Sequence, residues 1–202
     1  MIALVDYDAG NVRSVEKAVT YLGGKAELTR DIDTIRKADH VIVPGVGAFE
    51  DAMGRLSRYG LVEPLREVAA AGTPIMGICL GLQLFFEHSE ESENDVPGLS
   101  LLPGRLKRFP ETPGYKIPQI GWNALRIRSD SRLFAGVPEG TFVYFVHSYY
   151  LQAEREEDVA ATAEYMIPFH AAVERDNIFA TQFHPEKSGE PGLQILKNFI
   201  SI

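Results

Sequence analysis

Residues 74–86 read PIMGICLGLQLFF, an apolar run that meets a cysteine between two glycines and continues as a second apolar segment. Pro74 to Cys79 has the unbroken apolar character of a strand that is covered on both faces of a sheet. The leucines and phenylalanines that follow Cys79 are typical of a buried helix. The stretch therefore predicts a strand, a sharp turn at Cys79 and a helix, a unit that belongs to parallel α/β sheets.

The same alternation extends through the first half of the chain. Ile2 to Tyr7 and His40 to Pro44 are further apolar runs that predict buried strands. Apolar residues spaced by three and four predict a helix from Val12 to Leu22, for which we expect Asn11 to be the N-cap, and a second helix over Leu61 to Ala71. A mostly parallel sheet covered by helices is the expected architecture.

The second half contains segments typical of strands and hairpins, namely Leu106–Phe109, Ile117–Ile127, Thr141–Gln152, Val159–Tyr165 and Ile178–Phe183. We expect antiparallel additions to the sheet there, followed by a closing helix over Glu190–Ile200. The polar loop Ser89–Gly98 is expected to be a solvated connection. No repeat or low-complexity linker divides the chain, so residues 1–202 are predicted to form a single domain.

Composition excludes several classes of function. The formal net charge of -8 disfavours nucleic acid as a partner, because phosphate backbones are themselves negative. No apolar run approaches the roughly 18 residues that span a membrane. The chain starts without a basic leader and a cleavage site, and Cys79 is its only cysteine, so we expect a cytoplasmic protein.

Cys79 is the candidate nucleophile. In the pattern Gly77-Ile78-Cys79-Leu80-Gly81, glycines stand two residues to either side, where side chains would collide with the neighbouring strand and helix if the cysteine sat in a strained turn. A helix starting after Cys79 would favour the thiolate, which is the attacking form. The alternatives are an inert buried thiol or a tight turn that merely needs small residues.

His184 is the candidate base. In His184-Pro185-Glu186 the proline excludes helix, and residues two apart in extended chain point to the same side, so the carboxylate can orient the imidazole. The alternative is an ordinary surface pair.

The other histidines fall into two groups. His40 would open a buried strand, His88 would lie on the polar side of a helix and His170 in an irregular segment, so these three are expected to be structural or solvated. His147 stands at a strand end where polar groups can line a pocket. With one cysteine and scattered histidines a metal site is not expected, and the absence of phosphate-binding glycine motifs argues against a nucleotide cofactor.

The cysteine turn and the late His-Pro-Glu together resemble the class I glutamine amidotransferases over nearly the whole chain. That resemblance implies a flavodoxin-like three-layer α/β/α fold with no cofactor, in which Cys79 attacks glutamine, His184 is general base and acid, and Glu186 orients it. Backbone N–H groups of Val46, Gly47 and Leu80 would form the oxyanion hole. Glutamine would be bound by Gly47, Gln83, His147, Ser148, Tyr149 and an acidic side chain; Glu87, Glu90, Glu91 and Glu93 compete for that last role, and we select Glu91.

Five stretches resemble the histidine-biosynthesis branch of this family, the glutaminase subunits of imidazole glycerol phosphate synthase. They are Asp8–Asn11, Pro44–Gly47, Ile120–Asn123, Tyr144–Tyr149 and His184–Ser188. The resemblance implies a heterodimer with a (β/α)₈-barrel cyclase that receives the ammonia. Asn11, Trp122 and Lys187 are expected at that interface or channel, although Trp122 could equally be a core residue. The rival interpretations are a glutaminase of another amidotransferase, a cysteine hydrolase of the related peptidase or deglycase group, and a binding module without catalysis.

Overall fold

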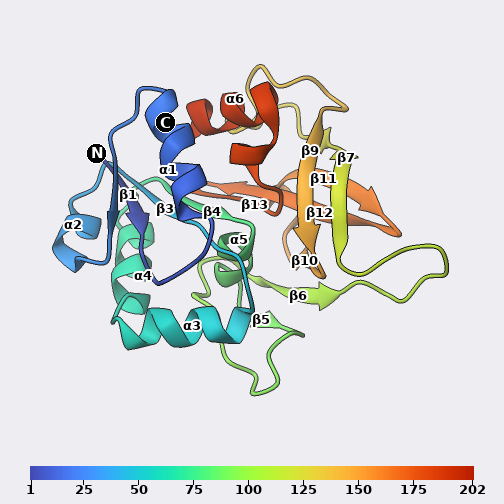
Figure 1. The fold of residues 1–202 in the computed structure, drawn as a ribbon, viewed down its shortest axis with the longest axis horizontal. Helices are drawn as coiled ribbons and strands as arrows, with labels where there is room; N and C mark the ends of the chain where they lie inside the picture. The colour runs from blue at the N-terminus through green and yellow to red at the C-terminus, as the bar shows by residue number, and fades with distance from the viewer.

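The computed structural model describes residues 1–202 and is built around one large sheet (Figure 1). Five strands pair in parallel in the order β2 (Ala26–Thr29), β1 (Ile2–Val5), β3 (His40–Val43), β4 (Ile75–Ile78) and β13 (Ile178–Thr181). The three apolar runs predicted as buried strands are thus confirmed, each one or two residues shorter than predicted. Every residue of β1 and β4 is buried, as expected for strands covered on both faces.

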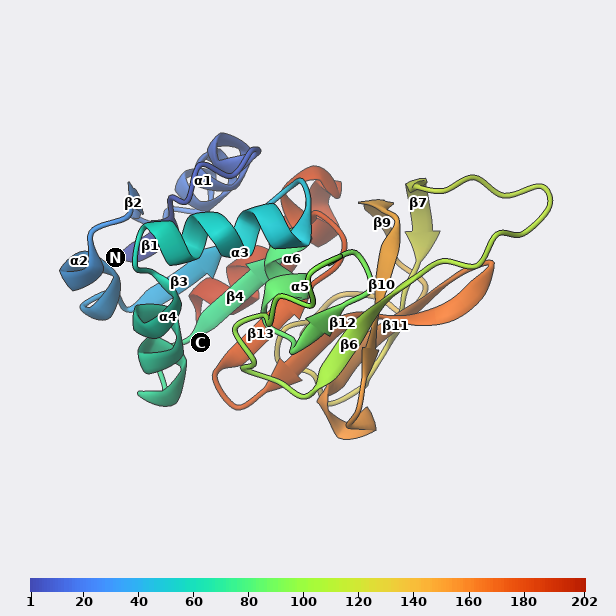
Figure 2. The ribbon, with the colours of Figure 1, turned by 90° about the horizontal axis from the view of Figure 1, so that it is seen from below.

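Helices cover both faces of these strands (Figures 1 and 2). Alternate strand residues face opposite sides: Leu4 packs in the core under α1 (Val12–Tyr21) and α6 (Gly189–Ile200), whereas Ala3 packs in the core on the other face. That second core contains residues of α2 (Ile32–Arg36), α3 (Phe49–Arg58), α4 (Val62–Ala70) and α5 (Leu80–Leu84). The three-layer α/β/α arrangement is therefore confirmed. None of these helices has the length and apolarity needed to cross a membrane.

The predicted antiparallel additions are also confirmed. Beyond β13 the sheet continues antiparallel through β12 (Ile167–Arg175), β10 (Tyr149–Ala153) and β6 (Gly104–Arg108), and ends at the two-residue strand β5 (His88–Ser89). On a separate branch, β11 (Val159–Tyr165) pairs with β12 and with β8 (Arg126–Ile127). A second, two-stranded sheet consists of β7 (Gln119–Ala124) and β9 (Phe142–His147). Phe145 of β9 packs edge-on against Phe169 of β12, which joins this small sheet to the core.

Several expectations were wrong in detail. The strand β12 was not predicted, and His170 lies within it, where its Nδ1 accepts a hydrogen bond of 3.1 Å from the N–H of Ala153. His88 is in strand β5 and exposed, not on a helix. The loop after Ser89 is more than a solvated connection, because Ser92 and Asn94 donate hydrogen bonds to Glu50 of α3. The structure also adds β2, α2 and α3, none of which was predicted.

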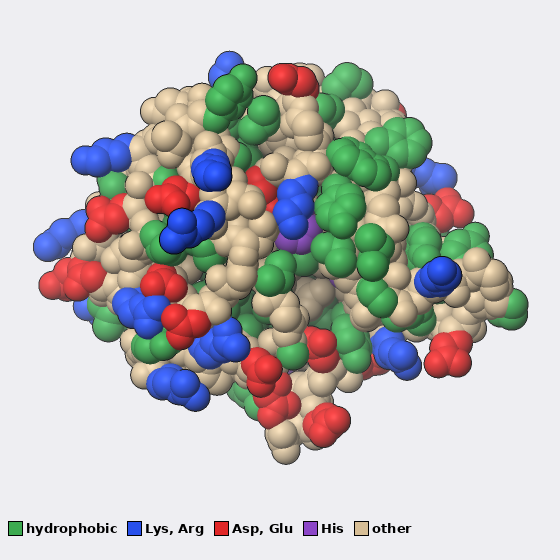
Figure 3. Space-filling view, viewed as in Figure 1, with side chains coloured by type: hydrophobic (Ala, Val, Ile, Leu, Met, Phe, Trp, Pro, Cys, Tyr) green, Lys and Arg blue, Asp and Glu red, His purple; other side chains and the backbone are tan.

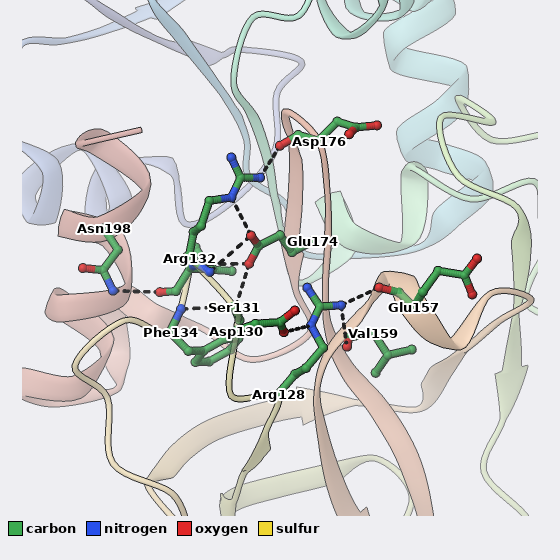
Figure 4. Close-up of polar contacts among 11 residues, drawn as sticks. Arg128, Asp130, Ser131, Arg132, Phe134, Glu157, Val159, Glu174, Asp176 and Asn198 are labelled. Carbon is green, nitrogen blue, oxygen red and sulfur yellow. Dashed lines mark hydrogen bonds and ion pairs between the residues drawn. The ribbon is translucent and has the colours of Figure 1, made fainter.

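A buried carboxylate fixes the connection between β8 and β9 (Figure 4). Glu174 of β12 is 6% exposed and accepts hydrogen bonds from the hydroxyl of Ser131 at 2.6 Å, the guanidinium of Arg132 at 2.7 Å and the N–H of Leu133 at 3.1 Å. These charge-assisted contacts lower the pKa of Glu174 although burial opposes them. Glu174 thereby anchors a loop that has no strand or helix of its own.

Candidate active site

Cys79 occupies the turn between β4 and α5 in a strained backbone conformation, with φ 56° and ψ -106°. A Cβ on Gly77 would lie 2.5 Å from the carbonyl oxygen of Gly81, and a Cβ on Gly81 would lie 1.8 Å from the carbonyl oxygen of Val43. Both distances are far inside van der Waals contact. The two glycines are therefore a steric requirement of the turn that presents Cys79.

His184 lies just after β13, and its side chain and that of Glu186 are almost completely buried. Nδ1 of His184 donates a hydrogen bond of 2.8 Å to Oε1 of Glu186, which leaves Nε2 without a bonding partner. The ring also lies beside Cys79. Burial alone would lower the pKa of His184, but the adjoining sulfur and the carboxylate outweigh it and raise that pKa to about 9. The imidazolium form of His184 is thus favoured at neutral pH.

The side chain of Asn11 contacts the same carboxylate. Asn11 is the N-cap residue of α1, as predicted, but its side chain makes no capping hydrogen bond. The residue adopts a left-handed conformation with φ 67°, and its side-chain amide donates a hydrogen bond of 2.5 Å to Oε1 of Glu186. Asn11 therefore helps to fix the group that orients His184.

A pocket of about 260 Å³ opens beside Cys79. Its walls include all the residues to which the sequence assigned glutamine or oxyanion binding, namely Val46, Gly47, Leu80, Gln83, Glu91, His147, Ser148 and Tyr149. Of the four competing acids, only Glu91 lines it. One oxygen of Glu91 accepts a hydrogen bond of 2.8 Å from the N–H of Phe49, and burial raises its pKa. His184 and Glu186 are not among the lining residues.

The inner wall of the pocket contains polar side chains with fixed orientations. His147 donates from Nδ1 to the carbonyl oxygen of Tyr149 at 2.8 Å, and burial lowers its pKa to about 4, so its ring is neutral. Gln83 is buried and donates to the same carbonyl at 3.3 Å and to Oε1 of Gln182 at 3.2 Å. Sequence reasoning missed Gln182. Its only signal was its place two residues before His184, where extended chain points both side chains to one side.

The backbone donors expected to bind an oxyanion are only partly available. The N–H of Leu80 donates to the carbonyl oxygen of Gly45 at 3.3 Å, whereas the N–H groups of Val46 and Gly47 have no acceptor in the protein. The segment is held from beneath by Tyr7, whose hydroxyl donates to the carbonyl oxygen of Pro44 at 2.6 Å. Burial raises the pKa of Tyr7, so the hydroxyl keeps its proton as a donor.

The residues expected at a partner interface lie on the surface near this site. Trp122 is 52% exposed, which rules out the core alternative, and its ring packs against Tyr144 at 5.9 Å between centroids. Tyr144 in turn lies 6.4 Å from the ring of His184. Lys187 is exposed in the short 3₁₀ helix η2 (Pro185–Lys187). No group of three or more histidine, cysteine, aspartate or glutamate side chains is arranged to hold a metal ion.

Solved structures share this fold at low sequence identity. One described as a glutamine amidotransferase superposes with a TM-score of 0.76 at 19% identity, covering 98% of this chain and 99% of that chain. The structure of PurLQS from Thermotoga maritima gives a TM-score of 0.75 at 20% identity, covering 99% and 97%.

Sequence relatives are much closer. Imidazole glycerol phosphate synthase subunit HisH of Moorella thermoacetica is 52% identical over 98% of this chain and 93% of the relative. The protein of the same name from Syntrophotalea carbinolica is 48% identical over 98% of both chains. The family model described as glutamine amidotransferase class-I matches residues 3–202. The chain therefore belongs to the class I glutamine amidotransferases.

Proposed function

We propose that this protein is the glutaminase subunit of an imidazole glycerol phosphate synthase and that it works in the cytosol. The observation that carries the chemistry is a strained cysteine in the wall of a pocket, next to a histidine that a buried glutamate orients. The pocket suits a molecule of amino-acid size, and its one acidic wall residue, Glu91, is placed to pair with an α-ammonium group. The full-length relatives named HisH support the assignment to this synthase.

The reaction begins when the Cys79 thiolate attacks the carboxamide carbon of glutamine and forms a tetrahedral oxyanion. His184 then gives its proton to the departing nitrogen, the C–N bond breaks, and ammonia leaves behind a thioester on Cys79. Water attacks that thioester while His184 takes a proton from it, and glutamate is released with the thiolate restored. The raised pKa of His184 suits the first step, because the ring carries its proton at neutral pH.

The oxyanion hole needs a rearrangement before this chemistry can be fast. The N–H of Leu80 already donates to the carbonyl oxygen of Gly45. That carbonyl would also repel the negative oxygen of the intermediate if it lay beside Leu80. Turning the peptide between Gly45 and Val46 would remove the carbonyl and present the N–H of Val46 in its place. Such a turn changes ψ of Gly45 and φ of Val46, and Gly45 tolerates a wide range of backbone conformations because it has no side chain. We therefore expect low activity from the free chain and stimulation by its partner.

The partner is a (β/α)₈-barrel cyclase that consumes the ammonia. Ammonia released to water becomes ammonium, which is not a nucleophile, so transfer requires a closed path from Cys79 to the second active site. Figure 3 shows apolar side chains gathered over β7 and β9 on the viewed face. Ile120, Trp122 and Phe142 of these strands are 64%, 52% and 60% exposed. An exposed apolar group of this kind marks a docking surface, and we assign the cyclase to it.

The direct test is a glutaminase assay with increasing amounts of the candidate cyclase. Wild-type protein should release little glutamate alone and much more with the cyclase, and Cys79→Ala should release almost none under either condition. A glutamine-derived chloroketone should label Cys79 selectively. Full activity in Cys79→Ala would overturn the nucleophile, whereas labelling without cyclase stimulation would favour a glutaminase of another amidotransferase.

A further inference from the structure

Gln182 is completely buried next to the reacting sulfur, and the mechanism above does not use it. It stands between the last residue of β13, Thr181, and Phe183, where the chain leaves the sheet toward His184. Its Nε2 lies 3.8 Å from Sγ of Cys79, within the range of a hydrogen bond to sulfur. The only other hydrogen bond of its side-chain amide is with Gln83.

The direction of the Gln182 amide is fixed by its surroundings. Gln83 donates from Nε2 to Oε1 of Gln182 at 3.2 Å and to the carbonyl oxygen of Tyr149 at 3.3 Å. Both acceptors require Gln83 to present its NH₂ group, so Oε1 of Gln182 must face Gln83 and its NH₂ must face Cys79. The backbone carbonyl oxygen of Tyr149 therefore orients the side-chain amide of Gln83. Gln83 in turn orients the amide of Gln182 so that its NH₂ group points at Sγ of Cys79.

The two protonation states of Cys79 use different partners. As a thiol, Sγ can donate to the carbonyl oxygen of Val146, 3.9 Å away. As a thiolate it can only accept, and then the carbonyl of Val146 is unfavourable while the NH₂ of Gln182 is favourable. A buried amide donor thus stabilises the thiolate more than the thiol, because the neutral sulfur is only a weak acceptor.

We propose that Gln182 stabilises the Cys79 thiolate and sets, together with His184, the pH range over which the nucleophile is ionised. This role rests on the proposed function of Cys79 as the nucleophile. The orientation of Gln182 depends in turn on Gln83, which makes Gln83 a positioning residue for the sulfur in addition to a wall of the pocket.

The test measures how fast iodoacetamide alkylates Cys79 as a function of pH, in the full-length chain without glutamine. Alkylation reports the thiolate directly and requires neither the cyclase nor an organised oxyanion hole. Gln182→Met keeps the volume and removes the donor. Since a hydrogen bond to a charged group is worth at least a factor of ten in an equilibrium constant, the midpoint should rise by about one pH unit.

Two further variants keep the experiment decisive. Gln182→Glu places acceptor oxygens against the sulfur and should raise the midpoint further than Gln182→Met. Gln83→Leu leaves Gln182 in place but frees its amide to turn, so it should give a smaller rise and also remain informative if substitution at 182 prevents folding. Gln194→Met on α6, whose amide donates to Asn198, is the matched control and should leave the midpoint unchanged.

The outcomes separate this inference from the proposed function. If Gln182→Met folds and its alkylation profile coincides with that of wild type, Gln182 does not stabilise the thiolate, although Cys79 can still be the nucleophile. If wild-type Cys79 is alkylated no faster than an ordinary thiol at neutral pH and glutamine gives it no protection, the nucleophile assignment itself fails.

Discussion

Asn11 shows how a single polar side chain outside the pocket supports His184 and Glu186, the proposed base and its orienting carboxylate. Its amide donates to Oε1 of Glu186, the oxygen that also accepts from His184, while Oε2 of Glu186 has no partner in the protein. Asn11→Gly removes the amide and tolerates the left-handed backbone at φ 67°. Loss of a hydrogen bond to a buried charge should lower glutaminase turnover about tenfold.

Asn11→Ala separates this effect from backbone strain. It lacks the same amide but disfavours the left-handed conformation, so it should match Asn11→Gly in turnover while melting at a lower temperature. Cyclase-stimulated rates and thermal melts of the two variants provide the comparison. Wild-type turnover in Asn11→Gly would show that the contact with Glu186 has no catalytic consequence.

The sequence predicted the positions of those site residues that lie in short contiguous motifs. The glycines that its strained turn requires predicted the position of Cys79. The two-residue spacing of His184 and Glu186 predicted their contact, because such residues lie on the same side of an extended chain. Gln182 and Tyr7 act through contacts with residues 103 and 37 positions away. No local pattern encodes such contacts, so sequence reasoning could not assign them a role.

At the level of secondary structure, burial decided which strands were recognisable. β1, β3 and β4 are interior strands and read as apolar runs. β2 lies at the sheet edge with Glu27 and Leu28 exposed, so its sequence has no apolar run. β12 contains Pro168 and the two alanines Ala171 and Ala172, which are poor strand formers. Helix α3, by contrast, carries an apolar stripe at helical spacing in Phe49, Ala52, Met53 and Leu56, so its sequence does predict a helix.

The loop anchored by Glu174 gives a stability prediction with a defined pH dependence. The pKa of Glu174 is lowered in the folded protein from an ordinary value of 4.5, so the carboxylate stabilises the fold above about pH 4.5, and that contribution is lost as the pH falls through the lower, folded-state pKa. Glu174→Gln keeps the shape but removes the charge. It should cost about 2 kcal/mol at pH 7, and the difference from wild type should shrink in strongly acidic buffer.

Urea unfolding at pH 7 and at acidic pH measures that difference. Glu139→Gln is a suitable control, because Glu139 also accepts a backbone hydrogen bond, from Ile127, but at an exposed site. Its effect should stay within about 0.5 kcal/mol. An equal loss of stability for Glu174→Gln at both pH values would mean that shape, not charge, anchors the loop.

For the whole molecule, the small β7–β9 sheet separates the core from the proposed cyclase. Val143 and Phe145 point inward and are fully buried, and the alternation of β strands then forces Trp122, Tyr144 and Phe142 to the outer side. An outer face with polar residues would serve a free monomer equally well. The large apolar side chains there support the proposal that the cyclase covers this face.

Truncating this face should therefore weaken association with the cyclase and leave the fold intact. Because buried aromatic anchors commonly contribute about 2 kcal/mol or more, Trp122→Ala and Phe142→Ala should each raise the dissociation constant at least about tenfold in a calorimetric titration. Tyr21→Ala on α1, where the side chain is 75% exposed outside this sheet, is the matched control and should bind as wild type does. If all three variants bind the cyclase equally, docking must use another surface; if none binds while wild type does, the loss is not specific to the face. Selective loss with Trp122 and Phe142 would place the cyclase over the strand that leads to the Cys79 pocket, since β9 ends at His147 in its wall.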